Sequence, residues 1–143
     1  MNKITYYLDT EFNGFGGELI SMALVSPVGH EFYEVLEITQ EYDPWVEKHV
    51  IPILNKEPIS KKAFQKKLEL FLNKFADHNI EIIADWPDDI RYFCEALILS
   101  PGVSINTPRV LTFIMNRDLP NTATYSKIPH NALEDARLLA RYF

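Results

Sequence analysis

The sequence contains one cysteine, Cys94, among its 143 residues. A single thiol cannot close an internal disulfide, which is typical of proteins in a reducing compartment. The chain also lacks any apolar run near the ~20 residues that cross a bilayer, and its N-terminus lacks the charged and then apolar pattern of a signal peptide. We therefore predict a cytoplasmic protein without a membrane partner.

Basic residues are outnumbered, with 14 lysines and arginines against 20 acidic residues and a formal net charge of −6. Proteins that hold long nucleic acids by their phosphates are usually basic, so this balance argues against a DNA-coating protein. It argues less against a nuclease, because a cation bound in an acidic pocket makes that pocket locally positive. The G-x-x-x-x-G-K-[ST] loop of nucleotide-binding proteins is also absent.

The order of the predicted elements indicates the fold class. Hydrophobic residues make up 47% of the chain, enough for a core, and we expect residues 1–143 to form a single domain. Strands are predicted over residues 3–11, 18–25, 30–38, 80–84 and 109–115, and helices from Asp43-Pro44, from Ser60, after residue 84 and from about residue 130. Residues 100–108 and 116–129 are expected to be loops. This order predicts an α/β fold with a mixed five-stranded sheet, antiparallel in its first three strands and parallel in the last two, flanked by helices on both faces.

Two acids end the first strand, in the run Leu8-Asp9-Thr10-Glu11. Successive side chains of a strand point to opposite faces, so Asp9 and Glu11 share one face and Thr10 takes the other. Two carboxylates side by side repel each other unless a cation lies between them, and Mg²⁺ and Mn²⁺ prefer such oxygen ligands. The alternative is a strand that simply ends in solvated acids.

Further acids follow the fourth strand and open the last helix. Asp89 belongs to the inner, apolar stripe of the helix after residue 84, where it is either an N-terminal cap or a metal ligand. Asp135 lies on the apolar stripe of the last helix, where a carboxylate is costly unless it has a partner. Asn131 and Glu134 resemble a capping box, and Glu134 is also expected to lie on an outward ionic row with Arg137 and Arg141.

Three segments resemble the motifs of the DEDDh 3′–5′ exonucleases of the ribonuclease H-like superfamily, which include ribonuclease T and oligoribonuclease. They are Asp9-Thr10-Glu11, Asp85-x-x-x-Asp89-Ile90 and His130-x-x-x-x-Asp135. The run Asp43-Pro44-Trp45-Val46 is most similar to the small bacterial and phage 3′–5′ exoribonucleases. The second motif departs from the pattern, because many relatives have asparagine where Asp85 stands.

The resemblance implies a ribonuclease H-like fold and two-metal-ion hydrolysis of single-stranded RNA from its 3′ end to nucleoside monophosphates. Two divalent cations, Mg²⁺ or Mn²⁺, would be held by Asp9, Glu11, Asp89 and Asp135, with Asp9 shared between them. His130 would be the general base, although a loop histidine beside the helix start is the alternative. Asp85 is retained as a substrate-side or second metal contact.

The remaining predictions concern the partner. Phe12, Phe15 and Trp86 are candidates to stack on the terminal bases, with packing inside the fold as the alternative. The expected partner is a single strand with a free 3′ end, and the preference for RNA depends on the resemblance alone. A DNA exonuclease, a phosphodiesterase for very short oligonucleotides and a non-catalytic binding module of the same fold stay open. Whether the chain works as a homodimer also stays open.

Overall fold

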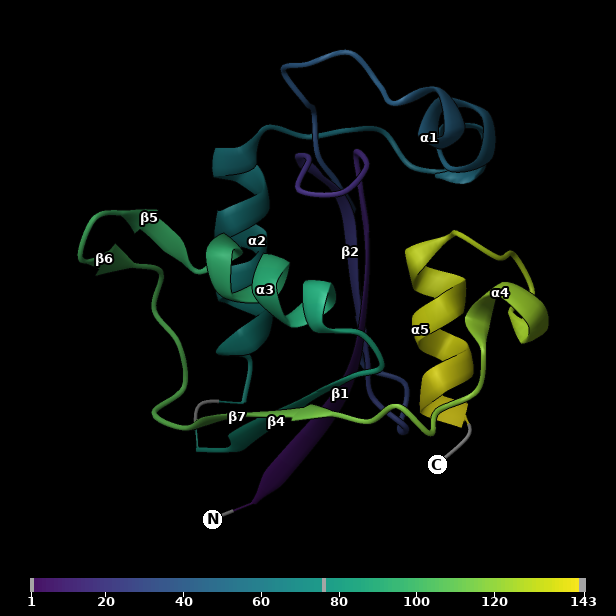
Figure 1. Ribbon diagram of the computed structural model, residues 1–143. Helices are drawn as coiled ribbons and strands as arrows, with labels where there is room; N and C mark the ends of the chain where they lie inside the picture. The colour runs from purple at the N-terminus through teal and green to yellow at the C-terminus, as the bar shows by residue number, and fades with distance from the viewer. Residues whose placement is uncertain (1, 76, 142–143) are drawn as a thin grey trace.

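A mixed five-stranded sheet forms the centre of the computed structural model, which describes residues 2–75 and 77–141 (Figure 1). Its strands, in spatial order, are β3 (Glu31–Val35), β2 (Leu19–Val25), β1 (Lys3–Phe12), β4 (Asn79–Ala84) and β7 (Leu111–Met115). β2 pairs antiparallel with β1 and β3, whereas β4 pairs parallel with β1 and β7. The predicted α/β class and mixed sheet are confirmed, and β1 is the central strand.

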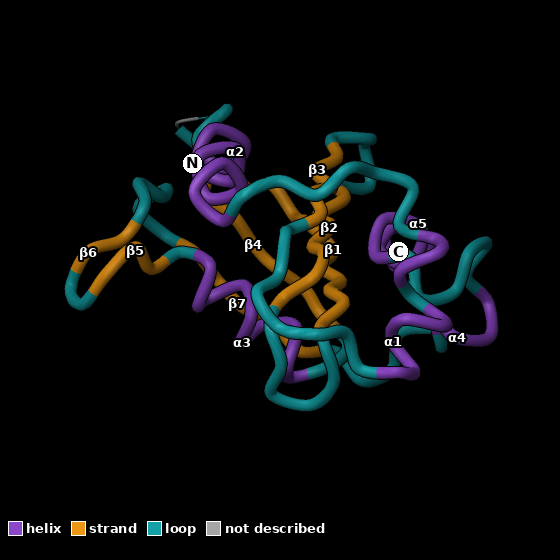
Figure 2. Tube along the Cα trace, turned by 90° about the horizontal axis from the view of Figure 1, so that it is seen from above, coloured by secondary structure: helices purple, strands orange, loops and turns teal. Residues whose placement is uncertain are grey.

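Helices cover both faces of this sheet, as predicted (Figure 2). They are α1 (Pro44–His49), the 3₁₀ helix η1 (Ile51–Ile53), α2 (Lys61–Leu72), α3 (Pro87–Ala96), α4 (Thr122–Tyr125) and α5 (Ala132–Arg141). The alternation along β1 decides which helix each side chain meets: Tyr6 and Leu8 join the core with α2 and α3, and Tyr7 joins the core with α5. Within the described residues, no helix is both long and apolar enough to span a bilayer.

Three predicted helix starts are confirmed by their caps. The Asp43 carboxylate accepts hydrogen bonds from the amides of Trp45 and Val46, with Pro44 at the first helical position of α1. Ser60 Oγ accepts from the Ala63 amide at the start of α2 (3.1 Å), and Asn131 Oδ1 accepts from the Glu134 amide at the start of α5 (3.0 Å). Local sequence therefore determines where these helices begin.

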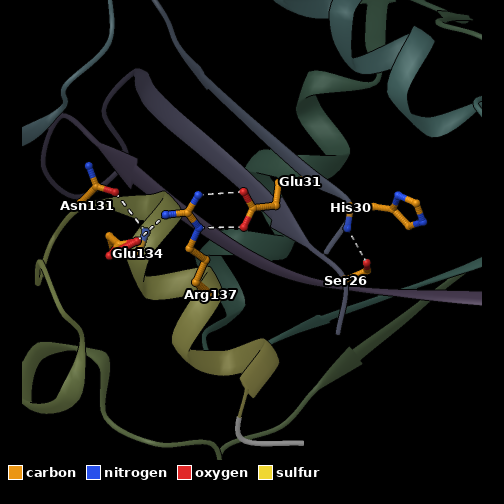
Figure 3. A network of polar contacts seen from close by, with 6 residues as sticks. All are labelled: Ser26, His30, Glu31, Asn131, Glu134 and Arg137. Atoms are coloured by element: carbon orange, nitrogen blue, oxygen red, sulfur yellow. Dashed lines mark hydrogen bonds and ion pairs between the residues drawn. The ribbon is translucent and has the colours of Figure 1, made fainter. Parts of the chain in front are cut away.

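The predicted outward position of Glu134 is wrong. Its side chain is buried, and its carboxylate accepts from Arg137 Nη1 at 2.7 Å instead of completing the capping box. Arg137 also donates two hydrogen bonds to Glu31 on β3, from Nε at 2.7 Å and from Nη2 at 2.8 Å (Figure 3). The fork of the guanidinium thus joins α5 to the edge strand of the sheet, a contact that helix periodicity alone cannot indicate.

Two segments predicted as loops contain regular structure. A hairpin of β5 (Ile98–Ser100) and β6 (Val103–Ser104) projects from the body of the fold, and α4 lies within residues 116–129 (Figure 1). Elements this short carry no periodic pattern that a sequence could reveal. The third strand is also shorter than predicted, since β3 ends at Val35 and Leu36 makes a single bridge to Ile59.

We expect Asn131→Ala to lower the free energy of unfolding by about 1–2 kcal/mol, because it removes the cap of α5 and the hydrogen bond from Asn131 Nδ2 to the Ile53 carbonyl (2.8 Å). Urea denaturation measures this loss. Asn121→Ala is the matched control, since Asn121 precedes α4 without a side-chain capping bond. Equal stability of the two variants would show that the cap contributes nothing.

Candidate metal centre

Asp9 and Glu11 lie at the C-terminal end of β1, between β2 and β4. They share one face of the sheet, as the alternation predicted, and the strand pairing becomes irregular directly after Glu11. Asp9 is only 7% exposed, and Glu11 is half-buried. The solvated strand end that the sequence left open is therefore not what forms, because the first acid is inside the protein.

Asp85 and Asp89 approach this strand end from the neighbouring strand. β4 runs parallel to β1, so the two strands end at the same edge of the sheet, and α3 begins there. Asp85 directly follows β4, and Asp89 lies in the first turn of α3, where it is buried. Thr10 Oγ1 donates a hydrogen bond of 2.6 Å to Asp89 Oδ1, which holds this carboxylate beside Asp9.

Asp135 arrives from the opposite face of the sheet, in the first turn of α5. Asp9, Glu11 and Asp135 each offer an oxygen within 4.8 Å of the other two, and Asp9, Asp85 and Asp89 do the same. We call these five residues the carboxylate cluster. Asp9 belongs to both groups of three, and both Asp85 and Asp89 lie beside it.

Burial raises the pKa values throughout the carboxylate cluster. The pKa of Asp9 and that of Glu11 lie well above their ordinary values, because desolvation and the charges of neighbouring acids both disfavour ionisation. Desolvation likewise raises the pKa of Asp89 to about 7, that of Asp135 to about 6, and that of Asp85 in the same direction. The cluster therefore resists carrying all of its charges at neutral pH.

Two buried oxygens of the cluster, Asp9 Oδ2 and Asp135 Oδ1, have no hydrogen-bond partner among the described residues. A buried carboxylate oxygen without a donor is costly, and a divalent cation satisfies several such oxygens at once. Each group of three offers the oxygen ligands that Mg²⁺ and Mn²⁺ prefer. Each group of three could therefore hold a hard divalent cation, and Asp9 belongs to both groups.

One positively charged side chain beside the cluster, that of Arg117, was not among the residues predicted from the sequence. Arg117 places its guanidinium over the indole of Trp86, 4.9 Å from the ring centroid, and its charge acts to lower the pKa of Asp85 against the larger effect of burial. The only signal in the sequence was that Arg117 closely follows the strand predicted over residues 109–115, which ends at the same sheet edge as β4.

His130 lies beside α1, and its imidazole ring contacts Trp45 of that helix. Its imidazole meets the indole of Trp45 edge to face, with ring centroids 5.0 Å apart and an interplanar angle of 81°. Burial, together with the charge of nearby His49, lowers the pKa of His130, so the imidazole is mostly neutral at pH 7. The residue has a left-handed backbone (φ 72°) directly before Asn131, the cap of α5. Its predicted role as general base stays a prediction.

The three aromatic candidates differ in their surroundings. Phe12 is half-buried and stacks on Tyr92 of α3, with ring centroids 4.7 Å apart, so it packs within the fold. Phe15 is 93% exposed, in the turn of residues 13–17 that follows β1 and contains Gly14, Gly16 and Gly17. Trp86 is 49% exposed, and the guanidinium of Arg117 lies over its ring. Phe15 and Trp86 are therefore accessible to a ligand, whereas most of Phe12 is used for packing.

Comparison with known proteins adds no assignment. No protein-family model matches the chain, and no curated protein matches it.

We expect Asp9→Asn to stabilise the protein in EDTA at pH 7.5, because it removes a carboxylate whose charge is disfavoured by burial and by the neighbouring acids. The pKa of Asp9 is higher in the folded protein than in the unfolded chain. Protonated Asp9 therefore contributes fully to stability at a pH below the ordinary carboxyl pKa, and this contribution is lost as the pH rises through the pKa of the folded state. The difference in melting temperature from wild type should accordingly grow between pH 4.5 and 7.5.

Adding Mn²⁺ should reverse the order of the two proteins, because only wild type retains the shared ligand. Asp118→Asn, at an exposed acid outside the cluster, is the control and should leave both the pH dependence and the response to Mn²⁺ unchanged. A variant of Asp9 that melts like Asp118→Asn under all these conditions would contradict the electrostatic account of the cluster.

Proposed function

We propose that the chain is a metal-dependent 3′–5′ exonuclease of ribonuclease H-like fold that acts on single-stranded RNA. The observation that carries the proposal is the position of Asp9 in two groups of three carboxylates, drawn from the three segments that resemble the exonuclease motifs. The pairing of the sheet, with β1 antiparallel to β2 and parallel to β4, supports the fold assignment. A binding module would gain nothing from so costly a cluster of buried charge.

In this proposal Asp9, Glu11 and Asp135 would hold one cation, and Asp9, Asp85 and Asp89 would hold another. Bound divalent cations supply positive charge to a phosphodiester and lower the pKa of a coordinated water. Asp85 thus becomes a ligand in its own right. Asp89 Oδ1 accepts a hydrogen bond from Thr10, and Asp89 is also among the residues that could hold a metal ion.

The chain's own groups then have distinct tasks. The neutral imidazole of His130 accepts a proton from the attacking water as the water oxygen bonds to phosphorus. The bond from phosphorus to the 3′ oxygen of the preceding nucleotide breaks, the 3′ oxygen takes a proton from solvent water, and His130 returns its proton to solvent. The products are a nucleoside 5′-monophosphate and a strand shortened by one unit. For this task the His130 imidazole has to reach the attacking water, and His130 lies on the loop directly before α5, whose first turn carries Asp135.

Single-stranded substrate is favoured by the charge of the protein. A chain of net charge −6 is poorly suited to holding the two phosphate backbones of a duplex. RNA is preferred here because of the motif resemblance, with DNA and very short oligonucleotides as alternative substrates. The position of His130 against Trp45 is the observation that favours the non-catalytic alternative, so activity measurements are decisive.

The direction of attack is tested with a 5′-labelled single-stranded RNA in the presence of Mn²⁺. We expect stepwise shortening and release of nucleoside monophosphates, which EDTA or Asp9→Asn abolishes. A 3′-phosphate on the strand should stop degradation, whereas a blocked 5′ end should not. Internal cleavage of a circular strand, or shortening from the 5′ end, would contradict a 3′–5′ exonuclease, and parallel DNA strands measure the preference between the two nucleic acids.

His130→Ala should reduce turnover by about 10²–10⁴-fold, the usual contribution of a positioned general base. Its Mn²⁺ affinity, measured by calorimetry, should stay near that of wild type, because His130 lies outside both groups of carboxylates. The wild-type rate at saturating Mn²⁺ should rise with pH through a pKa below the ordinary histidine value, and the variant should lose this limb.

His49→Ala is the matched control, since His49 stacks on the same Trp45 (4.7 Å between centroids) but carries no proposed chemistry. It should retain most of the turnover. If His130→Ala also turns over like wild type, His130 is only a structural residue at the start of α5. If its Mn²⁺ affinity falls in proportion to its rate, it is a ligand.

A further inference from the structure

We propose that Arg117, held on the indole of Trp86, binds a phosphate of the substrate strand next to the carboxylate cluster. This inference rests on the proposed function and adds a substrate-binding residue that the sequence motifs do not contain. It also changes the role of Trp86, from a surface for a base to a support for a guanidinium.

The indole of Trp86 is fixed in place by its neighbours. Trp86 Nε1 donates a hydrogen bond of 3.2 Å to Asp88 Oδ2, and Asp88 Oδ1 is in turn paired with Arg91 Nη2 at 3.3 Å. Trp86 also directly follows Asp85 of the cluster and directly precedes α3. The guanidinium of Arg117 packs on this anchored ring, which restricts its freedom and so reduces the entropy lost when Arg117 binds a ligand.

The charge of Arg117 is not neutralised by an ion pair. Within residues 2–75 and 77–141 the arginines that form ion pairs are Arg91 and Arg137, and Arg117 makes none. It is nevertheless close enough to Asp85 for its charge to act on that carboxylate. Arg117 therefore presents an exposed fork of N–H donors at the margin of the cluster.

A phosphodiester is the ligand that fits this arrangement. A planar guanidinium forms paired hydrogen bonds with phosphate oxygens, and its binding to Trp86 leaves the edge of the fork free. An acidic protein repels nucleic acid at long range, so a positively charged side chain beside the cluster helps to hold the strand there. If metal ions bound in the cluster hold the phosphate that is cleaved, Arg117 is placed to bind the adjacent phosphate of the strand.

The test compares Arg117→Gln and Arg117→Lys with a control, Arg109→Gln. Arg109 is exposed, loses the same charge in its variant, and precedes β7, whereas Arg117 follows it. Binding of a fluorescent single-stranded RNA is measured by anisotropy with Ca²⁺ present, over a series of KCl concentrations, and gels confirm that the strand stays intact. Steady-state rates with Mn²⁺ give kcat and KM separately.

We expect Arg117→Gln to weaken binding about tenfold, to act mainly through KM, and to reduce the slope of log affinity against log salt by about one. Arg117→Lys should recover part of the affinity, because it restores the charge without the fork. Arg109→Gln should bind within about twofold of wild type. All three results together support a phosphate contact at Arg117, with or without cleavage of the strand.

Equal behaviour of Arg117→Gln and Arg109→Gln, in an enzyme that still releases monophosphates, would overturn this inference and leave the proposed function standing. In that case Arg117 merely covers Trp86. A wild-type protein that neither binds nor shortens the strand would overturn the proposed function, and this inference with it.

Discussion

The repulsion among buried carboxylates around Asp9 is the constraint on which the rest of this structure depends. Asp9 is almost fully buried, and acids from β4, α3 and α5 lie close to it without a hydrogen-bond donor for its Oδ2. Such a group is costly to build, so the surrounding fold has to hold it rigidly. The central position of β1 meets this requirement, because its apolar side chains pack on both faces directly before the acid.

The placement of α5 shows how that rigidity is achieved. Asp135 reaches Asp9 only if the first turn of α5 lies against the sheet, and contacts on several sides hold it there. Asn131 caps the helix and also donates to Ile53, while Arg137 links Glu134 of the helix to Glu31 of β3 (Figure 3). Leu139 adds an apolar contact with the sheet. Asp135 is thus positioned by residues that have no proposed chemical role themselves.

Charged side chains are distributed unevenly around the cluster. The acids gather at one edge of the sheet, and Arg117, whose charge acts on Asp85, lies on Trp86 beside them. The imidazole of His130 contacts the indole of Trp45. Two half-exposed indoles, Trp45 of α1 and Trp86 directly before α3, thus each contact a side chain with a proposed role: Trp45 contacts His130, and Trp86 contacts Arg117.

Much of this arrangement could be predicted from the sequence, because it depends on local rules. Strand alternation places Asp9 and Glu11 on one face, helix periodicity turns Asp89 inward, and Asp43, Ser60 and Asn131 mark helix starts by their capping chemistry. The parallel run of β4 beside β1 then follows from the order of elements, and it brings the acids to one edge.

Only the tertiary structure decided the contacts between segments far apart in the chain. Whether Asp85 or Asp89 approaches Asp9 depends on the path of the chain between β4 and α3, and both do. The placing of Arg117 on Trp86, His130 on Trp45 and Phe12 on Tyr92 is likewise set by how the loops and helices pack. The sequence by itself determines which face of an element a side chain occupies; the partner it meets there depends on distances that no local period encodes.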